Sequence, residues 1–194
     1  MKRTTFRVMM TALLVLGTVG PAYSQREGRT TFTGTAVIYG TGASTRTITR
    51  QFTLRIDNVT SQADADRFLR VLERGGQDDL LREIDDNDLG RFSLGASVGL
   101  PLNAVLVDNF EGLTRVRAVF ARWIGFGELR YGHRSVDYPF SYVELIIDRD
   151  GRGQGSYFQA ARIRSRPGNT IEIEDFGTFP SKLMGVQMRG RRLG

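Results

Sequence analysis

The stretch from residue 140 to residue 163 constrains the fold of this chain more than any other. Within it, Asp150-Gly151 separates two runs that are rich in β-branched and aromatic residues, and an Asp-Gly pair in that setting predicts a β-hairpin. A two-residue turn at this pair would place Val143 opposite Phe158. Because side chains alternate along a strand, the apolar residues of the hairpin would then share one face: Val143, Leu145, Ile147 and Phe158.

The second face of this hairpin carries more polar side chains, and we expect it to meet solvent or a ligand. Its residues are Tyr142, Glu144, Tyr157 and Gln159. Further along the second strand, Phe158 and Ile163 are an odd number of positions apart, so they would lie on opposite faces of a regular strand. Two such residues share a buried face only where the strand is interrupted, so we expect a bulge or sharp bend near Ala160-Ala161.

A turn at Pro167-Gly168-Asn169 predicts one more antiparallel strand over residues 170–176. If the loop has three residues, one apolar pair and two pairs of opposite charge face each other: Ile163 with Ile173, Arg164 with Glu172, and Arg162 with Glu174. Opposite charges across neighbouring strands stabilise a sheet. These charged residues therefore need no functional explanation.

Residues 30–57 have the alternation of two further strands, joined at the flexible Gly40-Thr41-Gly42. The first strand alternates threonines with the apolar residues Phe32, Ala36 and Ile38. The second strand has the pattern of an antiparallel strand with one polar face. Its apolar residues are Ile48, Phe52, Leu54 and Ile56.

The hydrophobic period changes after residue 60, which predicts helices. Ser61-Gln62-Ala63-Asp64 is similar to a capping box with Asp in place of the usual Glu. The apolar residues that follow have helical spacing: Ala65, Phe68, Leu69 and Leu72. Gly75-Gly76 is expected to end this helix, and a second, shorter helix is expected over residues 77–84. From residue 91 onward the pattern is typical of strands.

These elements predict an α+β fold, an antiparallel β-meander or curved sheet with a two-helix insertion after the first β-hairpin. The 194-residue chain is 40% hydrophobic and 25% charged, a globular composition that excludes wholesale disorder. We expect residues 25–190 to form a single α+β domain that is long enough to bury a core. Residues 191–194 are expected to be a frayed basic tail.

Residues 1–24 have the features of a secretory signal peptide. The basic residues of its first segment are Lys2, Arg3 and Arg7. The apolar run from Val8 to Gly20 is too short to span a bilayer comfortably, and Ala22-Tyr23-Ser24 supplies small residues for cleavage before Gln25. We therefore expect a periplasmic or secreted protein without a transmembrane span after the leader is removed.

The charge distribution and the absence of cysteine exclude one class of partner and several kinds of chemistry. The chain carries 27 Lys and Arg against 21 Asp and Glu, a formal net charge of +6, and removal of the three leader cations lowers it to +3. The arginines are scattered along the chain, so we expect no nucleic-acid partner. The chain has no cysteine, which excludes a disulfide, a thiol nucleophile and a cysteine-ligated metal.

The sequence lacks the usual catalytic and cofactor motifs. His133 is the only histidine, and no Gly-x-Ser-x-Gly elbow accompanies it. A single histidine without cysteine leaves too few ligands for zinc, and no glycine-rich nucleotide loop opens a helix. We therefore expect no metal, no cofactor and no assigned catalytic residue. A pair of carboxylates of the kind that hydrolyses glycosidic bonds stays open among the Asp and Glu residues.

One segment rich in aromatic residues offers candidate binding residues. Its aromatic side chains, one histidine and one carboxylate could line a pocket: Trp123, Phe126, Tyr131, His133, Asp137 and Tyr138. Aromatic side chains with a few polar groups are the usual lining of a small-ligand site. The alternative is that the aromatic residues belong to the core.

Five segments of the chain have distinctive sequences: FTGTAVIYG at 32–40, FTLRI at 52–56, RGGQD at 74–78, DYPF at 137–140 and FGTFP at 176–180. Together they resemble a family of secreted bacterial hypothetical proteins, over roughly residues 30–189. The resemblance implies export. It implies no activity, cofactor, partner or site residue, because no function is assigned to that family.

The expected function is a non-enzymatic one. We expect a small-ligand-binding protein or an envelope interaction module, whose partner is a small ligand or an envelope protein, because catalytic groups are missing and a curved sheet can enclose a ligand. The alternative is a carboxylate-dependent hydrolase that acts on an envelope or extracellular substrate. A buried pair of carboxylates would favour the hydrolase, and an apolar cavity lined by Trp123, Phe126 and Tyr138 would favour the ligand-binding protein.

Overall fold

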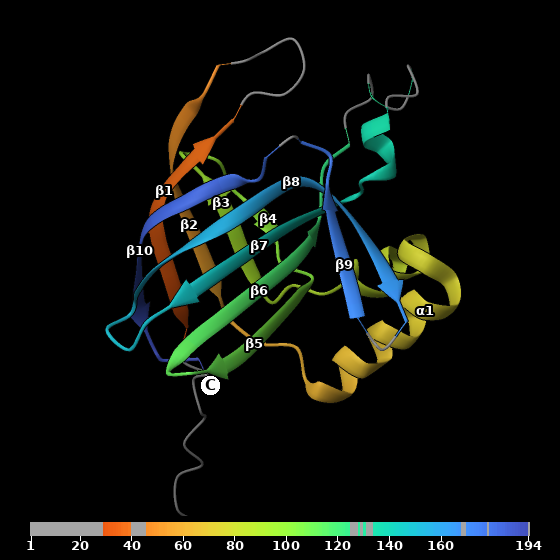
Figure 1. The fold of residues 1–194 in the computed structure, drawn as a ribbon, viewed down its shortest axis with the longest axis horizontal. Coiled ribbons are helices and arrows are strands. Elements are labelled where there is room, and N and C mark those ends of the chain that lie inside the picture. The colour runs from red at the N-terminus through yellow and green to blue at the C-terminus, as the bar shows by residue number, and fades with distance from the viewer. Residues whose placement is uncertain are drawn as a thin grey trace, which may run out of the picture.

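Over the residues that it describes, the computed structural model has one large antiparallel sheet and the long helix α1 (Figure 1). It describes residues 29–39, 46–124, 128, 130, 134–167, 170–177 and 179–193. Its strands are β1 (Thr30–Ile38), β2 (Ile48–Ile56), β3 (Gly90–Leu94), β4 (Leu100–Pro101), β5 (Ala104–Phe110), β6 (Leu113–Ala121), β7 (Phe140–Ile147), β8 (Arg152–Arg166), β9 (Thr170–Asp175) and β10 (Ser181–Gly190). The helices are α1 (Gln62–Ile84) and the short 3₁₀ helix η1 (Arg134–Asp137). The expected α+β class with a curved antiparallel sheet is confirmed.

The order of strands in the sheet differs from their order in the chain. Neighbouring strands follow the order β4-β3-β2-β1-β10-β8-β7-β6-β5, and β9 pairs with β8 outside this path. The C-terminal strand β10 therefore lies between β1 and β8, where it pairs with both in antiparallel fashion. It joins the N-terminal hairpin to the rest of the sheet.

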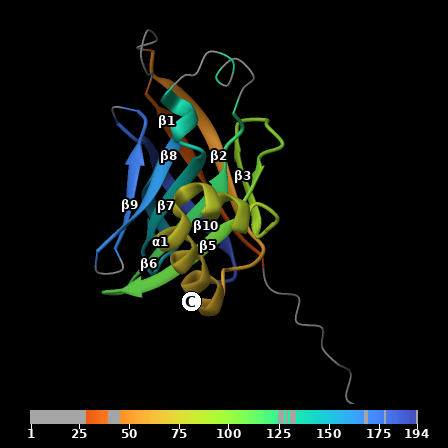
Figure 2. The ribbon, with the colours of Figure 1, turned by 90° about the vertical axis from the view of Figure 1, so that its right-hand side faces the viewer.

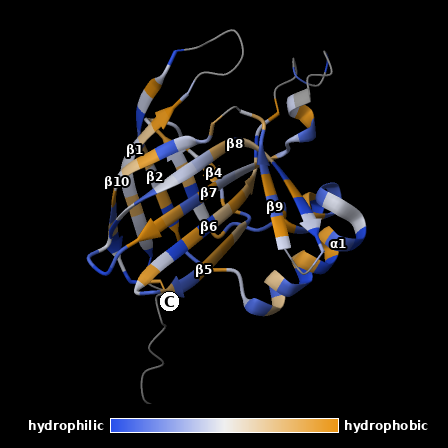
Figure 3. Ribbon diagram, viewed as in Figure 1, coloured by the Kyte–Doolittle hydropathy of each residue, from blue (hydrophilic) through white to orange (hydrophobic). Residues whose placement is uncertain are grey.

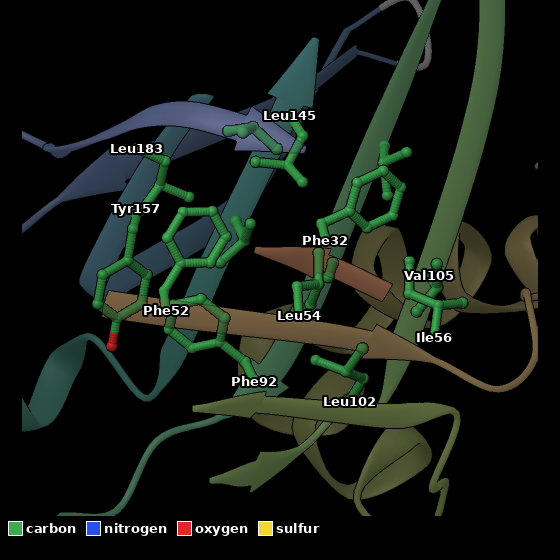
Figure 4. Packing of buried hydrophobic residues seen from close by; sticks show 14 of the residues in the cluster. Phe32, Phe52, Leu54, Ile56, Phe92, Leu102, Val105, Leu145, Tyr157 and Leu183 are labelled. Atoms are coloured by element: carbon green, nitrogen blue, oxygen red, sulfur yellow. The ribbon is translucent and has the colours of Figure 1, made fainter. Parts of the chain in front are cut away.

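The sheet curls until β2 and β3 face β6, β7 and β8 across a hydrophobic core (Figures 1 and 2). Phe92 of β3 shows this, because its ring centroid lies 5.6 Å from that of Phe120 on β6 and 4.7 Å from that of Tyr157 on β8. Figure 4 shows the same cluster with Phe32, Leu54 and Leu145 pointing into it. Inward side chains of β1–β3, β5–β8 and β10 thus contribute to one core.

Asn103 holds the two ends of the curled sheet together. It lies between β4 and β5, and it is 1% exposed. Its backbone N–H donates to the carbonyl of Val119 (3.0 Å), and its side-chain Oδ1 accepts from the N–H of Ala121 (2.7 Å). Its Nδ2 donates to the carbonyls of Asp85 and Asn87. One buried amide therefore connects β6 with the segment that follows α1.

The helix packs on the outer face of the sheet. Ser61 caps its first turn, as predicted, by accepting a hydrogen bond from the N–H of Asp64. Its buried residues recur every four positions or twice that spacing: Phe68, Leu72, Leu80 and Ile84. They contact outward side chains of β5, β7 and β8 in a second hydrophobic cluster. Hydrophobic and hydrophilic residues alternate along the strands and the helix (Figure 3).

The two expected helices are one helical element in the structure, α1, which has a kink at Gly76 where the sequence predicted an interruption. Gly76 alone has non-helical angles (φ 76°, ψ −166°), and the residues on both sides are helical. The kink at Gly76 separates two helical parts of α1, and apolar residues of both parts are buried on the same outer face of the sheet. Within the described chain, no helix has the length and apolar character required to cross a membrane.

The hairpin at Asp150-Gly151 is present, but its register differs from the predicted one by one residue. Val143 pairs with Tyr157, and Tyr142 pairs with Phe158. The loop has three residues because Asp148 Oδ1 accepts from the N–H groups of Asp150 (2.8 Å) and Arg152 (2.9 Å), while Gly151 has the positive φ (75°) of such loops.

The corrected register exchanges two aromatic residues between the faces of the sheet. Tyr157, expected outside, lies in the core with Val143, Leu145 and Ile147. Phe158, expected inside, packs against the outer cluster. A shift of one residue moves every side chain of a strand to the other face.

The remaining two pairing predictions are confirmed. Between β8 and β9, Ile163 pairs with Ile173, Arg164 with Glu172 and Arg162 with Glu174. Between β7 and β8 the register shifts from the Tyr142–Phe158 pair to the Phe140–Ala161 pair, which is the expected bulge. After the bulge, β8 leaves the curled sheet and pairs with β9 (Figure 1).

Candidate functional site

A pocket of about 380 Å³ lies between α1 and the outer face of β5–β9. Most of its lining is apolar: Ala65, Phe68, Leu69, Leu72, Leu80, Ile84, Ala104, Leu106, Val119, Phe158, Ile163, Ile171 and Ile173. Figure 2 shows α1 lying across this part of the sheet. The helix and the sheet therefore enclose a mainly hydrophobic space between them.

The alternation of the strands explains this lining. The outward residues of β5 are Ala104 and Leu106, while Val105 between them is in the inner core. On β8 the bulge exchanges the inward-facing and outward-facing positions, so that Phe158 before it and Ile163 after it both belong to the outer cluster. The displaced end of β8 and its partner β9 then form a side wall of the pocket, with Ile171 and Ile173.

Four polar side chains line the same pocket: Arg115, Arg117, Tyr142 and Glu144. They come from the neighbouring strands β6 and β7, where Arg117 pairs with Glu144 in register. Tyr142 donates a hydrogen bond from its hydroxyl to Glu144 Oε2 (3.1 Å). The other carboxylate oxygen of Glu144 lies 3.3 Å from Arg115 Nε. These contacts gather a phenol, a carboxylate and a guanidinium at one part of an apolar pocket.

The two arginines are held from the side of β5. Arg117 forms an ion pair with Asp108, and the guanidinium of Arg115 lies over the ring of Phe110, 4.6 Å from its centroid. A guanidinium has five N–H donors in a fixed plane. Each arginine therefore keeps donors beyond those used in these contacts, and both side chains are about one third exposed.

The hydroxyl of Tyr142 stays protonated at neutral pH. Burial raises the pKa of Tyr142 well above its ordinary value, and the neighbouring charge of Glu144 raises this pKa further. The phenol therefore acts as a hydrogen-bond donor and acceptor and carries no charge. With Glu144 as the single carboxylate in the lining, the pocket supplies polar contacts without a pair of acids.

The structure describes three of the six sequence-predicted site residues, Trp123, Asp137 and Tyr138. Phe126, Tyr131 and His133 lie outside the described residues. Trp123 is 78% exposed and lines a different pocket. Tyr138 is 5% exposed. Binding by these residues stays a prediction.

Asp137 and Tyr138 are brought together by one arginine of β8. Arg162 Nη2 lies 3.0 Å from Asp137 Oδ2, and its guanidinium lies 4.7 Å from the centroid of the Tyr138 ring. The Tyr138 hydroxyl donates to Glu174 Oε1 (2.5 Å), and its ring packs edge-on against Phe176. These contacts join η1 to β8 and β9, so they hold the fold together.

Sequence reasoning missed the pocket under α1. One signal was present, since Arg115 and Arg117 occupy alternate positions of a strand whose other positions are apolar. The hydrophobic pattern of the sequence does not indicate that the helix lies over these residues. Among the described residues, no group of three or more His, Asp or Glu side chains is placed to hold a metal ion.

Comparison of the chain with protein-family models, with curated proteins and with solved structures found no match. The resemblance to secreted bacterial hypothetical proteins therefore stays a prediction.

Proposed function

We propose that this protein is an exported, non-enzymatic protein that binds a small, mostly apolar molecule in the pocket between α1 and β5–β9. The observation that supports the proposal is the pocket itself, which has a volume of about 380 Å³ and a mainly aliphatic and aromatic lining. Small-molecule sites have volumes of roughly 300–1,000 Å³ and a few polar groups in an apolar wall. The signal peptide that the sequence predicts at residues 1–24 supports the proposal of export.

The polar side chains define the kind of molecule that fits. Arg115 and Arg117 present N–H donors, while Tyr142 and Glu144 are already hydrogen-bonded to each other. A ligand would therefore place an acceptor group, such as a carboxylate or a carbonyl oxygen, near the guanidinium groups. Its apolar part would lie between Phe68, on the helix, and the sheet. Each methylene transferred from water contributes about 0.8 kcal/mol.

The carboxylate-dependent hydrolase has less support at this site. Hydrolysis of a glycosidic bond uses two carboxyl groups, one as acid and one as base or nucleophile. In the described lining of the pocket, Glu144 is the one carboxylate. Its contacts with Tyr142 and Arg115 hold it as a polar wall of a binding site.

The proposal is tested with the dye 1-anilinonaphthalene-8-sulfonate, whose aromatic rings and sulfonate match the apolar wall and the arginines. We expect saturable fluorescence enhancement at one site, with displacement of the dye by decanoate. Leu106→Trp places an indole in the pocket and is expected to weaken dye binding by at least about tenfold, which is 1.4 kcal/mol.

Ile48→Trp is the matched control, because it adds the same side chain on a strand outside the pocket. It should bind the dye as the unmodified protein does. Circular dichroism and thermal unfolding establish that both variants are folded. Equal dye binding by both variants, or no displacement by decanoate, would contradict the proposal.

A further inference from the structure

A second pocket, of about 390 Å³, lies at one open end of the curled sheet. Its lining residues lie at or just beyond the ends of several strands, among them Arg122 and Trp123 after β6 and Phe176 after β9. It shares no lining residue with the pocket under α1. An inference about this pocket therefore stands independently of the proposed function.

The inner surface of this pocket is polar. Ser141 and Ser181 are buried there, and Gln159 lies between them on the neighbouring strand. The Ser141 hydroxyl donates to the carbonyl of Gln159 (2.9 Å), and Gln159 Nε2 donates to the Ser181 hydroxyl (3.4 Å). Each serine oxygen also has acceptor capacity. These groups can exchange hydrogen bonds with a ligand that carries hydroxyl groups.

Asp175 adds a carboxylate that is not neutralised by a cation in the described structure. Its Oδ1 accepts from the N–H of Gly177 (3.1 Å), and no ion pair to it occurs among the described residues. Burial raises the pKa of Asp175, against the lowering effect of the backbone hydrogen bonds. This carboxylate is suited to accept hydrogen bonds from ligand hydroxyl groups.

The one arginine of this pocket is fully engaged within the protein. The Arg122 guanidinium is nearly buried and pairs with Glu128 (2.6 Å), and it also donates to the carbonyls of Ser135 and Tyr138 (2.7 Å each). Its donors join the end of β6 to Glu128, Ser135 and Tyr138. Among the lining residues that the structure describes, no spare positive charge faces an anionic ligand.

Exposed aromatic side chains line the same pocket. Trp123 is 78% exposed, Phe179 is 68% exposed, and Phe176 is 43% exposed. Exposed apolar side chains that gather at one place on a surface usually mark an interaction site. Flat aromatic rings beside polar groups match a molecule with an apolar face and a polar edge.

We propose that this pocket is a saccharide-binding site for uncharged sugar units. A pyranose ring has a face of C–H groups, which can stack on the aromatic rings of Trp123 and Phe179. Its hydroxyl groups would donate to Asp175 and exchange hydrogen bonds with the serines and Gln159. Most of the lining is polar, which disfavours insertion of the aromatic residues into a lipid surface.

Trp123 is the only tryptophan of the chain, so its fluorescence reports directly on this pocket. The full protein is titrated with cellopentaose, chitopentaose and maltopentaose, and the emission of the tryptophan is followed. We expect at least one of these sugars to shift the emission in a saturable manner. Phe179→Ala and Asp175→Ala should each weaken that binding by at least about tenfold, since lost contacts of this kind are worth about 1.4 kcal/mol or more.

Val59→Ala is the control, because it truncates an exposed apolar side chain outside the pocket, and it should leave sugar binding unchanged. The same emission is followed with choline chloride and with vesicles of phosphatidylcholine and phosphatidylglycerol. No response to any of the three sugars overturns the proposal, and so does a response to choline or to vesicles alone. Sugar binding that is unaffected in the Phe179 and Asp175 variants also overturns it.

Discussion

At the scale of single residues, polar side chains that bind the backbone determine parts of the shape of this protein. Asn103 uses both ends of its amide to join three backbone segments. Asp148 lengthens a turn by one residue through two backbone hydrogen bonds. In both cases a side chain accepts or donates hydrogen bonds that the sheet does not supply to these backbone groups. Asn103 is buried, and buried backbone groups must be satisfied.

Replacement of Asn103 tests its role as a connector. Asn103→Ala would leave the N–H of Ala121 and the carbonyls of Asp85 and Asn87 without this partner. Each buried group left unsatisfied costs about 1–3 kcal/mol, so we expect the free energy of unfolding to fall by about 2–4 kcal/mol. Urea unfolding with an unchanged m-value measures this loss.

The control is Asn109→Ala, at an exposed position of β5. A surface substitution of this kind usually changes stability by less than about 0.5 kcal/mol. If the Asn103 variant is no less stable than the Asn109 variant, Asn103 does not hold the ends of the sheet together.

At the scale of elements, α1 and β8 each contain one irregular position that directs their apolar residues toward the same place. Gly76 bends the helix, and the bulge at the middle of β8 changes its parity. Both irregularities bring hydrophobic side chains to the outer face of the sheet. The pocket under the helix exists because these two elements converge there and leave a space between them.

Gly76→Ala tests the bend in α1. The backbone at this position has φ 76° and ψ −166°, a combination that is essentially confined to glycine. We therefore expect a loss of about 1–3 kcal/mol in the free energy of unfolding, measured by urea or thermal unfolding. Steric contact would not be the cause, since a Cβ at Gly76 would have no described atom within 4 Å.

Arg70→Ala on the exposed side of the same helix is the comparison for this variant. It replaces an exposed residue by a good helix former and is expected to leave stability nearly unchanged. A Gly76 variant as stable as the Arg70 variant would show that the helix can straighten at no cost.

At the scale of the whole molecule, β10 is the strand that makes one sheet from two parts of the chain. It pairs with β1 on one side and with β8 on the other. Its inward residues Leu183 and Val186 belong to the core that both parts share. The fold therefore depends on pairing between strands that are far apart in the sequence, and such pairing forms slowly.

A pair of substitutions on β10 tests this dependence. Val186 is buried and Met184 is about half exposed. Val186→Asp would bury a carboxylate without a partner, and we expect a loss of at least about 3 kcal/mol or of cooperative unfolding. Met184→Asp should stay within about 0.5 kcal/mol of the unmodified protein. Guanidinium unfolding of both variants provides the measurement, and equal effects would count against closure of the sheet by β10.

Features encoded within a few neighbouring residues were predictable from the sequence. The alternation of β1 and β2, the cap at Ser61, the hairpin at Asp150-Gly151 and the pairing of β8 with β9 depend on turn residues and on hydrophobic period. The bulge in β8 was also predictable, because parity along one strand is a local property. These signals were sufficient for the α+β class.

The tertiary structure decided where these elements meet. The hairpin register required Asp148 to accept two backbone hydrogen bonds, and the single helix required a shared apolar face on the sheet. The position of β10 and the two pockets depend on contacts between distant segments. Such contacts form because together they remove the most apolar surface from water. The sequence of any single segment does not determine which distant segment it will pack against.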